Sequence, residues 1–147
     1  MQKVVNTARA GFSLEFNDRS DGNKGLQSLY GLNFQVVTME PSLRYEAIDQ
    51  GNVDVIDVFS TDPEIITHDL VMLEDDRGLF PPYQGAPLLR ADTLKKYPEL
   101  EPVLNKLAGL ITTDEMLKMN YEVDVDGKTA NEVAVAYLKA KGLLQHK

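Results

Sequence analysis

The sequence contains no cysteine and only two histidines among its 147 residues. The missing cysteines exclude disulfide bonds and thiolate metal sites, and no other pattern of residues predicts a cofactor or a metal site. A nucleophilic triad needs a histidine as its general base. His146 is the second-to-last residue, where ordered structure is uncommon, and we interpret His68 as a surface histidine next to Asp69. We therefore do not expect an enzyme.

Long apolar runs and an excess of positive charge are also missing. No uncharged apolar run approaches the ~18 residues that a membrane-spanning helix needs, and residues 1–10 lack the apolar segment of a secretory signal. Lys and Arg number 15 against 23 Asp and Glu, which gives a formal net charge of −8. Because so acidic a surface repels phosphate backbones, we expect no nucleic-acid partner. We also expect no export signal in this chain.

The first half of the chain alternates strand patterns with short helical patterns, which predicts an α/β fold with a small mixed or parallel sheet. The predicted strands are residues 12–16, 34–39 and 53–59, and the predicted helices are residues 25–30 and 43–50. The expected core residues are Leu26, Leu29, Ile48, Val55 and Ile56. From about residue 87 onward the pattern is helical. Capping-box patterns at Thr112 and Thr129 predict where two of these helices begin.

Two groups of acidic residues and one pair of glycines have an ordinary structural interpretation. Residues 122–132 resemble a calcium loop, but Val133 occupies the twelfth position, where the bidentate Glu is required. An acidic strand, a glycine turn and a capped helix explain the same letters. Residues 74–76 are interpreted as a solvated acidic loop. Residues 22–25 lack the spacing of a phosphate-binding loop and are interpreted as a tight turn.

Three residues at predicted strand ends are candidates for binding a small ligand. Arg19 follows the first predicted strand, at the edge where open α/β sheets bind ligands. Its guanidinium could hold a carboxylate, or it could form a salt bridge with Asp18 or Asp21. Phe59 and Tyr83 could form part of an aromatic box for a cation, although aromatic residues at strand ends more often belong to the core.

Six segments of the chain, in the same order, closely resemble one family of proteins. They are residues 16–31, 43–48, 51–55, 59–62, 79–88 and 104–109. The longest two read FNDRSDGNKGLQSLYG and LFPPYQGAPL. The family comprises the substrate-binding proteins of ABC importers for glycine betaine, carnitine, choline and proline betaine. The resemblance runs from about Gly11 to Leu144, and several segments in the correct order are far more specific than any single motif.

The resemblance implies a protein that closes two α/β lobes around a quaternary ammonium compound held by aromatic rings. It assigns residues 11–82 to the second lobe and residues 83–147 to a helical segment that packs on the first lobe in full-length relatives. Residues 1–10 would be an altered start or the edge of a cloned fragment. Arg19 would hold a betaine carboxylate, and Phe59 and Tyr83 would belong to the cage. Phe59 departs from the family, which often has tyrosine there.

The implied function is the C-terminal portion of a substrate-binding component, with the ABC permease as its partner. The full-length protein would work at the extracellular face of the bacterial membrane or in the periplasm. We expect this chain alone to bind ligand at millimolar levels or not at all. It could form a homodimer to cover the apolar faces of Val133, Tyr137 and Leu138. The alternative is an acidic interaction module that keeps the fold without binding ligand.

Overall fold

The computed structural model describes residues 7–144 and divides the chain into two compact units. One unit runs up to Phe59 and also includes Glu64–Tyr83. The other consists of Ser60–Pro63 and the chain from Gln84 onward. None of the helices between residues 7 and 144 is long and apolar enough to cross a membrane.

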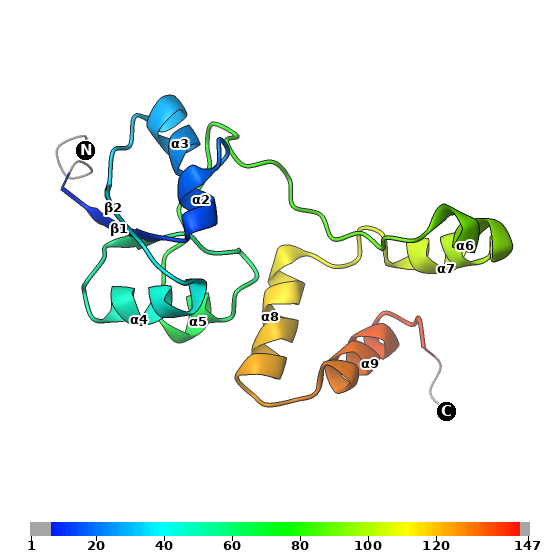
Figure 1. Ribbon diagram of the computed structural model, residues 1–147. Coiled ribbons are helices and arrows are strands. Elements are labelled where there is room, and N and C mark those ends of the chain that lie inside the picture. Colours follow the sequence, from blue (N-terminus) through cyan, green and yellow to red (C-terminus); the bar gives the residue numbers. More distant parts are fainter. Residues whose placement is uncertain (1–6, 145–147) are drawn as a thin grey trace. The chain divides into compact units, whose positions relative to one another are not determined.

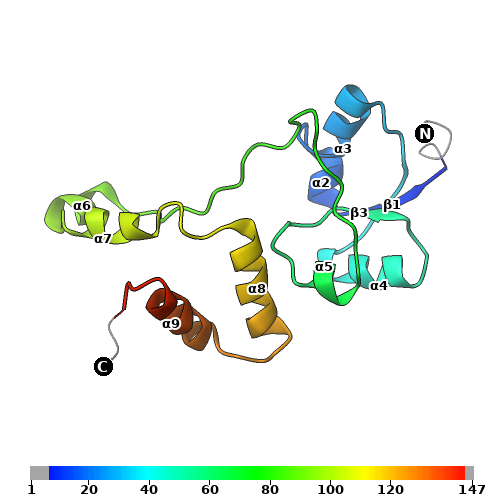
Figure 2. The ribbon, with the colours of Figure 1, turned by 180° about the vertical axis from the view of Figure 1, so that it is seen from behind.

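The first unit is built on a parallel sheet of three strands in the order β2-β1-β3. Figure 1 labels β1 and β2, and Figure 2 labels β1 and β3. The strands are β1 (Arg9–Phe12), β2 (Gln35–Thr38) and β3 (Val55–Ile56). In the register of the sheet, Ala10 lies opposite both Val36 and Val55. The α/β prediction is confirmed, and the predicted second strand coincides with β2 within one residue at each end.

The first predicted strand is wrong over most of its length. β1 ends at Phe12, and Leu14–Asp18 forms the short helix α2. Ser13 decides the change, because its hydroxyl accepts a hydrogen bond from the backbone N–H of Phe16 and so caps the helix. The alternation of apolar and polar residues there fits a strand and one turn of helix equally well. The third predicted strand is also too long, since β3 contains two residues only.

Short helices cover both sides of the sheet. They are α3 (Asn23–Gly25), the π-helical turn η1 (Leu26–Tyr30), the 3₁₀ turn η2 (Pro41–Leu43), α4 (Arg44–Asp49) and α5 (Glu64–Thr67). In two opposite views, α2 and α3 lie on one side of the sheet and α4 and α5 on the other, as Figure 2 shows from behind. After its carboxyl end, β1 leads into α2 on one side of the sheet, whereas β2 and β3 lead into α4 and α5 on the other side.

The core of the first unit is small and partly different from the predicted one. Its buried apolar side chains are Ala10, Phe12, Tyr45, Val53 and Ile65. Four of the five predicted core residues are half-buried, but Leu29 is 41% exposed. Leu26 and Leu29 would share a face of an α-helix, whereas the wider π-helical turn rotates them apart. His68 is half-buried, stacks on Tyr45 and contacts Asp49.

The second unit is helical, as predicted. Its elements are α6 (Ala91–Lys96), α7 (Leu100–Leu104), the 3₁₀ turn η3 (Asn105–Leu107), α8 (Thr113–Asp124) and α9 (Ala130–Ala140). Both capping boxes are confirmed, with Thr112 before α8 and Thr129 before α9. The acidic strand expected near residues 122–126 is wrong, because α8 extends to Asp124. Within residues 7–144 no group of acids and histidines could hold a metal ion.

The apolar residues expected to be uncovered on α9 are largely covered within the second unit. Val133 is only 5% exposed, and Tyr137 and Leu138 are half-buried. The Tyr137 hydroxyl donates a hydrogen bond of 2.6 Å to the carbonyl of Leu110. The reason we gave for a homodimer is therefore wrong for these three residues.

Candidate functional site

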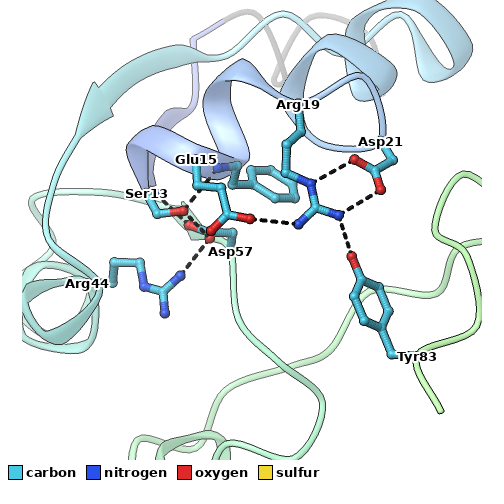
Figure 3. A network of polar contacts seen from close by, with 8 residues as sticks. Ser13, Glu15, Arg19, Asp21, Arg44, Asp57 and Tyr83 are labelled. Atoms are coloured by element: carbon cyan, nitrogen blue, oxygen red, sulfur yellow. Dashed lines mark hydrogen bonds and ion pairs between the residues drawn. The ribbon is translucent and has the colours of Figure 1, made fainter. Parts of the chain in front are cut away.

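The structure brings all three predicted ligand-binding residues together in the first unit. Arg19 and Tyr83 are 64 positions apart in the sequence, yet Nη2 of Arg19 donates a hydrogen bond of 2.6 Å to the hydroxyl oxygen of Tyr83 (Figure 3). The ring of Tyr83 makes an edge contact with the ring of Phe59, with 6.4 Å between their centroids. A guanidinium and two aromatic rings thus form one continuous cluster.

Arg19 reaches this cluster from a helix and not from the end of a strand. It is the residue after α2, with extended backbone angles that stop the helix. Because α2 begins two residues after β1 ends, Arg19 still stands at the carboxyl edge of the central strand. The prediction named the correct edge of the sheet but the wrong preceding element.

Two carboxylates of the same unit bind the Arg19 guanidinium. Nε and Nη2 donate to the two oxygens of Asp21 at 2.8 and 2.7 Å, and Nη1 donates to Glu15 at 3.1 Å. The expected salt bridge with Asp21 is therefore present. The hydrogen bonds from Arg19 lower the pKa of the Asp21 carboxyl, and in return Asp21 and Tyr83 raise the pKa of Arg19. One positive and two negative charges give this group a net charge of −1.

The two residues that carry the rings are more than half exposed. Phe59 is 61% exposed and Tyr83 is 62% exposed. Aromatic faces carry negative potential, so exposed rings beside a negatively charged cluster form a surface that attracts cations. These groups can therefore bind a cation through the faces of the two rings.

A buried ion pair holds the helix that carries Arg19. Asp57, just after β3, accepts hydrogen bonds of 2.9 Å from both the backbone N–H and the hydroxyl of Ser13. Arg44 of α4 completes the group with an ion pair of 2.6 Å to Asp57, and the two side chains are 6% and 12% exposed. Figure 3 shows this chain of contacts from Arg44 through Asp57 to Ser13. Since Ser13 caps α2, these contacts fix the origin of the helix that ends at Arg19.

A second set of contacts, which we call the Tyr30 latch, holds the segment that carries Tyr83. The Tyr30 hydroxyl donates to Asp75 and accepts from the backbone N–H of Arg77, and Asp75 accepts from the backbone N–H of Phe80. Burial first, and then the bond to Asp75, raises the pKa of Tyr30 to about 12. The same bond and backbone N–H groups lower the pKa of Asp75 to about 2. The interpretation of residues 74–76 as merely solvated is therefore wrong for Asp75.

Two glycines allow the chain to pack closely around this site. A Cβ on Gly22 would stand 2.2 Å from the carbonyl oxygen of Phe16, and one on Gly25 would stand 2.4 Å from Leu79. Gly22 precedes α3 and Gly25 ends it, so the interpretation as a tight turn alone is wrong. The glycines are needed because α2 and the segment before Tyr83 lie directly against α3.

Sequence reasoning missed the residues that position the site. Asp57 had a visible signal, since it is a charged residue inside the apolar run Val53–Phe59. Tyr30 and Asp75 had none, because their partnership depends on how distant segments pack. The calcium interpretation finds no support either, since Glu122 forms an ion pair of 2.7 Å with Lys128.

Comparison with known proteins assigns the family. Residues 1–140 match the family described as the substrate binding domain of ABC-type glycine betaine transport systems. The chain belongs to this family. The sequence resemblance is thereby confirmed.

Transport binding proteins from several bacteria are similar to this chain. The carnitine transport binding protein OpuCC of Listeria monocytogenes is 38% identical over all of this chain and 48% of its own length. The ergothioneine transport permease/ergothioneine binding protein EgtU of Helicobacter pylori is 37% identical over 90% of this chain and 24% of its own length. The glycine-betaine-binding protein of Pseudomonas aeruginosa is 30% identical over 88% of this chain and 43% of its own length.

Solved structures of the family have the same fold. A crystal structure of a glycine betaine/carnitine/choline ABC transporter protein matches 92% of this chain and 50% of its own, with a TM-score of 0.77 and 37% identity. Apo YehZ of Escherichia coli matches 97% of this chain and 53% of its own, with a TM-score of 0.70 and 25% identity. The chain therefore spans about half the length of these family members.

Proposed function

We propose that the chain is the C-terminal portion of the substrate-binding component of an ABC importer for quaternary ammonium osmoprotectants such as glycine betaine, carnitine or choline. The observation that carries the proposal is the cluster of two exposed rings and Arg19 in one unit. Family membership supports the same function. The names of relatives that bind carnitine and glycine betaine support the ligand class.

In this proposal the ligand-binding residues are Arg19, Phe59 and Tyr83. A trimethylammonium group has no N–H to donate, so it is recognised by the faces of aromatic rings and not by hydrogen bonds. Phe59 and Tyr83 supply those faces, and the acidic surroundings of Arg19 attract the cation. No bond of the ligand is made or broken, and the proposed role is transport without catalysis.

The affinity of this site can be worked out from its exposure. A cation gains about 0.5–1 kcal/mol from a ring at an exposed site and about 2 kcal/mol from a desolvated one. Since both rings are more than half exposed, the lower values apply, and the two rings supply about 1–2 kcal/mol. That free energy corresponds to a dissociation constant on the order of 100 mM. A second lobe that excluded water would raise the affinity by moving both rings toward the higher value.

A titration followed by NMR tests the proposal at this affinity. Phe and Tyr ring protons of the 147-residue chain would be recorded while choline chloride is added, with sodium chloride as the matched salt control. We expect saturable shifts of Phe59 and Tyr83. Tyr97 is the internal control, because it is a 44% exposed ring in the second unit with Lys96 already over its face. Shifts of Phe59 and Tyr83 no larger than those of Tyr97 would refute the proposal.

The lobes, the partner and the place of action of the full-length protein are the remaining parts of the proposal. We propose that residues 11–82 form part of the second lobe and that residues 83–147 pack on a first lobe. The partner would be the ABC permease, and the place of action the extracellular face of the membrane or the periplasm. The names of the relatives, which describe transport binding proteins and in one case a permease fusion, support this arrangement.

We also propose that the chain by itself associates with a second copy. Val71, Leu73 and Leu88 are 85%, 79% and 99% exposed, which leaves apolar surface that a second copy could cover. Light scattering should show an average mass that rises with concentration. A constant monomer mass would refute this part.

A further inference from the structure

One side chain of the Tyr30 latch closes the segment before Tyr83 into a loop. Asp75 accepts a hydrogen bond of 2.8 Å from the backbone N–H of Phe80, which ties the two ends of residues 75–80 together. The other oxygen of the Asp75 carboxylate accepts from the Tyr30 hydroxyl. Asp75 therefore both closes the loop and fastens it to the end of η1.

Arg77 attaches the same loop to η1 a second time. Its backbone N–H donates a hydrogen bond of 2.8 Å to the Tyr30 hydroxyl, and its Nη1 donates one of 2.6 Å to the carbonyl of Leu29. Its guanidinium lies over the Tyr30 ring, 5.1 Å from the centroid. Tyr30 is the last residue of a π-helical turn, and such turns frequently occur at functional sites. Both the ring and the hydroxyl of Tyr30 are thus used to hold the loop.

The far end of the loop packs on α2, the helix that precedes Arg19. The ring of Phe80 stacks on the ring of Phe16, with 6.3 Å between the centroids and 28° between the planes. Leu79 lies against α3 so closely that a Cβ on Gly25 would stand 2.4 Å from it. The loop is therefore fixed against α2, α3 and η1 within one unit.

Two prolines transmit the position of Phe80 to Tyr83. Pro81 and Pro82 are the residues between them. A proline ring fixes its own φ at about −65° and restricts the residue before it to extended conformations. The backbone from Phe80 to Tyr83 is therefore stiff. Because Tyr83 is 62% exposed, we expect its place to depend mainly on this backbone, and so on the latch.

We propose that Tyr30 and Asp75 are positioning residues of the ligand site, which set the place of the Tyr83 ring beside Phe59 and so raise the affinity for a quaternary ammonium ion without touching it. The proposal rests on the proposed function, because it assumes that the two rings bind the cation. It applies equally to every ligand of this class, since it concerns the placing of a ring face and not the rest of the ligand.

Tyr30→Phe tests the latch by removing one oxygen atom. Choline chloride would be titrated into the 147-residue chain, with sodium chloride as the salt control and the ring shifts of Phe59 and Tyr83 as the readout. We expect the affinity to fall roughly two- to fivefold, which corresponds to the loss of one exposed ring. The matched control is Tyr137→Phe, which removes a hydroxyl that donates 2.6 Å to the carbonyl of Leu110 in the second unit. The control should bind as the unchanged chain does, and an equally unchanged affinity in Tyr30→Phe would overturn the proposal.

The placing of the ring is also measured without ligand. The nuclear Overhauser effect between the ring protons of Phe59 and Tyr83 reports their edge contact. In Tyr30→Phe this signal should weaken, and the amide hydrogen of Phe80 should exchange faster with solvent. A residue that only stabilises the fold would lower the free energy of unfolding and leave the ring signal of the folded protein unchanged. That result would overturn the proposal.

A double variant shows whether Tyr30 acts through Tyr83. In Tyr83→Ala the shifts of Phe59 remain as the readout of binding. Adding Tyr30→Phe to this variant should weaken choline no further, because the ring that the latch places is already gone. A further loss as large as in the unchanged chain would mean that Tyr30 reaches the ligand by another route, and the proposal would be wrong.

Asp75→Asn tests the other positioning residue. It replaces one of the two accepting oxygens by a nitrogen that cannot accept, so either Tyr30 or Phe80 loses its partner. We expect a loss of affinity of the same size, roughly two- to fivefold. Glu74→Gln is the matched control, because it removes the same charge from the exposed neighbouring residue, and its loss should be much smaller. Equal losses would show that charge alone matters and would overturn the proposal.

The outcomes separate the positioning role from the function on which it rests. If choline shifts neither Phe59 nor Tyr83 in the unchanged chain, the proposed function fails and the inference falls with it. If choline binds the unchanged chain and Tyr30→Phe equally well, the proposed function stands and only the role of Tyr30 and Asp75 is wrong.

Discussion

Removing the carboxylate of Asp57 should destabilise the first unit more than any exposed substitution. Asp57 accepts hydrogen bonds from both the hydroxyl and the backbone N–H of Ser13 and pairs with Arg44 at 2.6 Å. In Asp57→Ala, Arg44 remains as a charge in a site where its side chain is 6% exposed. Removing one partner of a buried ion pair costs about 3–5 kcal/mol. Small domains have about 5–15 kcal/mol in total, so the variant should be close to unfolding.

Urea denaturation followed by circular dichroism measures this loss. Asp92→Ala is the matched control, because Asp92 also pairs with an arginine but both side chains are more than 70% exposed, and we expect a loss of at most ~1 kcal/mol there. Asp57→Asn keeps the shape and some hydrogen bonds, so it should lie between the two and remain measurable if the alanine variant does not fold. Replacing Arg44 and Asp57 together by apolar residues should restore part of the loss.

The reasoning would be refuted by an Asp57→Ala variant that loses no more stability than Asp92→Ala. Such a result would mean that water reaches the pair in solution and that the contact has the small value of a surface ion pair. A second result would refute only the assigned cause of the loss. If Asp57→Ala is strongly destabilised but the Arg44 and Asp57 double variant is worse still, the cost comes from lost packing and not from an uncompensated charge.

Three further predictions concern other parts of the chain. Gly25→Ala should lower the free energy of unfolding by roughly 1–3 kcal/mol, because the new Cβ would stand 2.4 Å from Leu79. Gly85→Ala is the control and should be close to neutral, because nothing lies within 4 Å of its new Cβ. Equal urea midpoints for the two variants would contradict this prediction. Because the folded state holds the pKa of Asp75 at about 2, below its usual 3.8, the free energy of unfolding should fall as the pH drops from about 4 toward 2. Asp75→Asn should give a flatter pH dependence, and parallel curves for the two proteins would contradict it. Thr129→Ala should lower the free energy of unfolding by about 1 kcal/mol, because it removes the N-cap of α9. On heating, the helical signal in circular dichroism should be lost at a lower temperature than in the unchanged chain.

Local signals in the sequence predicted the local structure correctly. The capping boxes at Thr112 and Thr129 depend on residues three positions apart, so the sequence contains all of their geometry. The strand at Gln35–Thr38 follows from a run of β-branched residues that also suits the sheet. The prediction at residues 12–16 failed because one period of alternation cannot be told from one helical turn, and the hydrogen bond from Phe16 to Ser13 made the choice.

The three candidate ligand-binding residues could be named from the sequence, whereas most of their partners could not. Arg19, Phe59 and Tyr83 stand beside predicted element ends, and the family resemblance singled them out. Asp21 was a local candidate partner for Arg19, and Asp57 stood out as a charge inside an apolar run, but nothing among the 23 acidic residues selects Asp75 or pairs Asp57 with Ser13 and Arg44. That Arg19 binds two carboxylates and a tyrosine at once depends on the path of the segment before Tyr83. Such long-range packing leaves no periodic signal.

The order of the strands has a consequence for how the protein forms during its synthesis. The central strand, Arg9–Phe12, leaves the ribosome first, but its neighbours are Gln35–Thr38 and Val55–Ile56. The sheet can begin to form once Gln35–Thr38 has emerged, but it is complete only after Val55–Ile56, and Asp57 must appear before Ser13 finds its partner. Until then the backbone of Arg9–Phe12 lacks its partners in the sheet. Pairings between distant segments form slowly because the intervening loop must close first, so we expect the central strand to stay unpaired until the segments that follow it have been made.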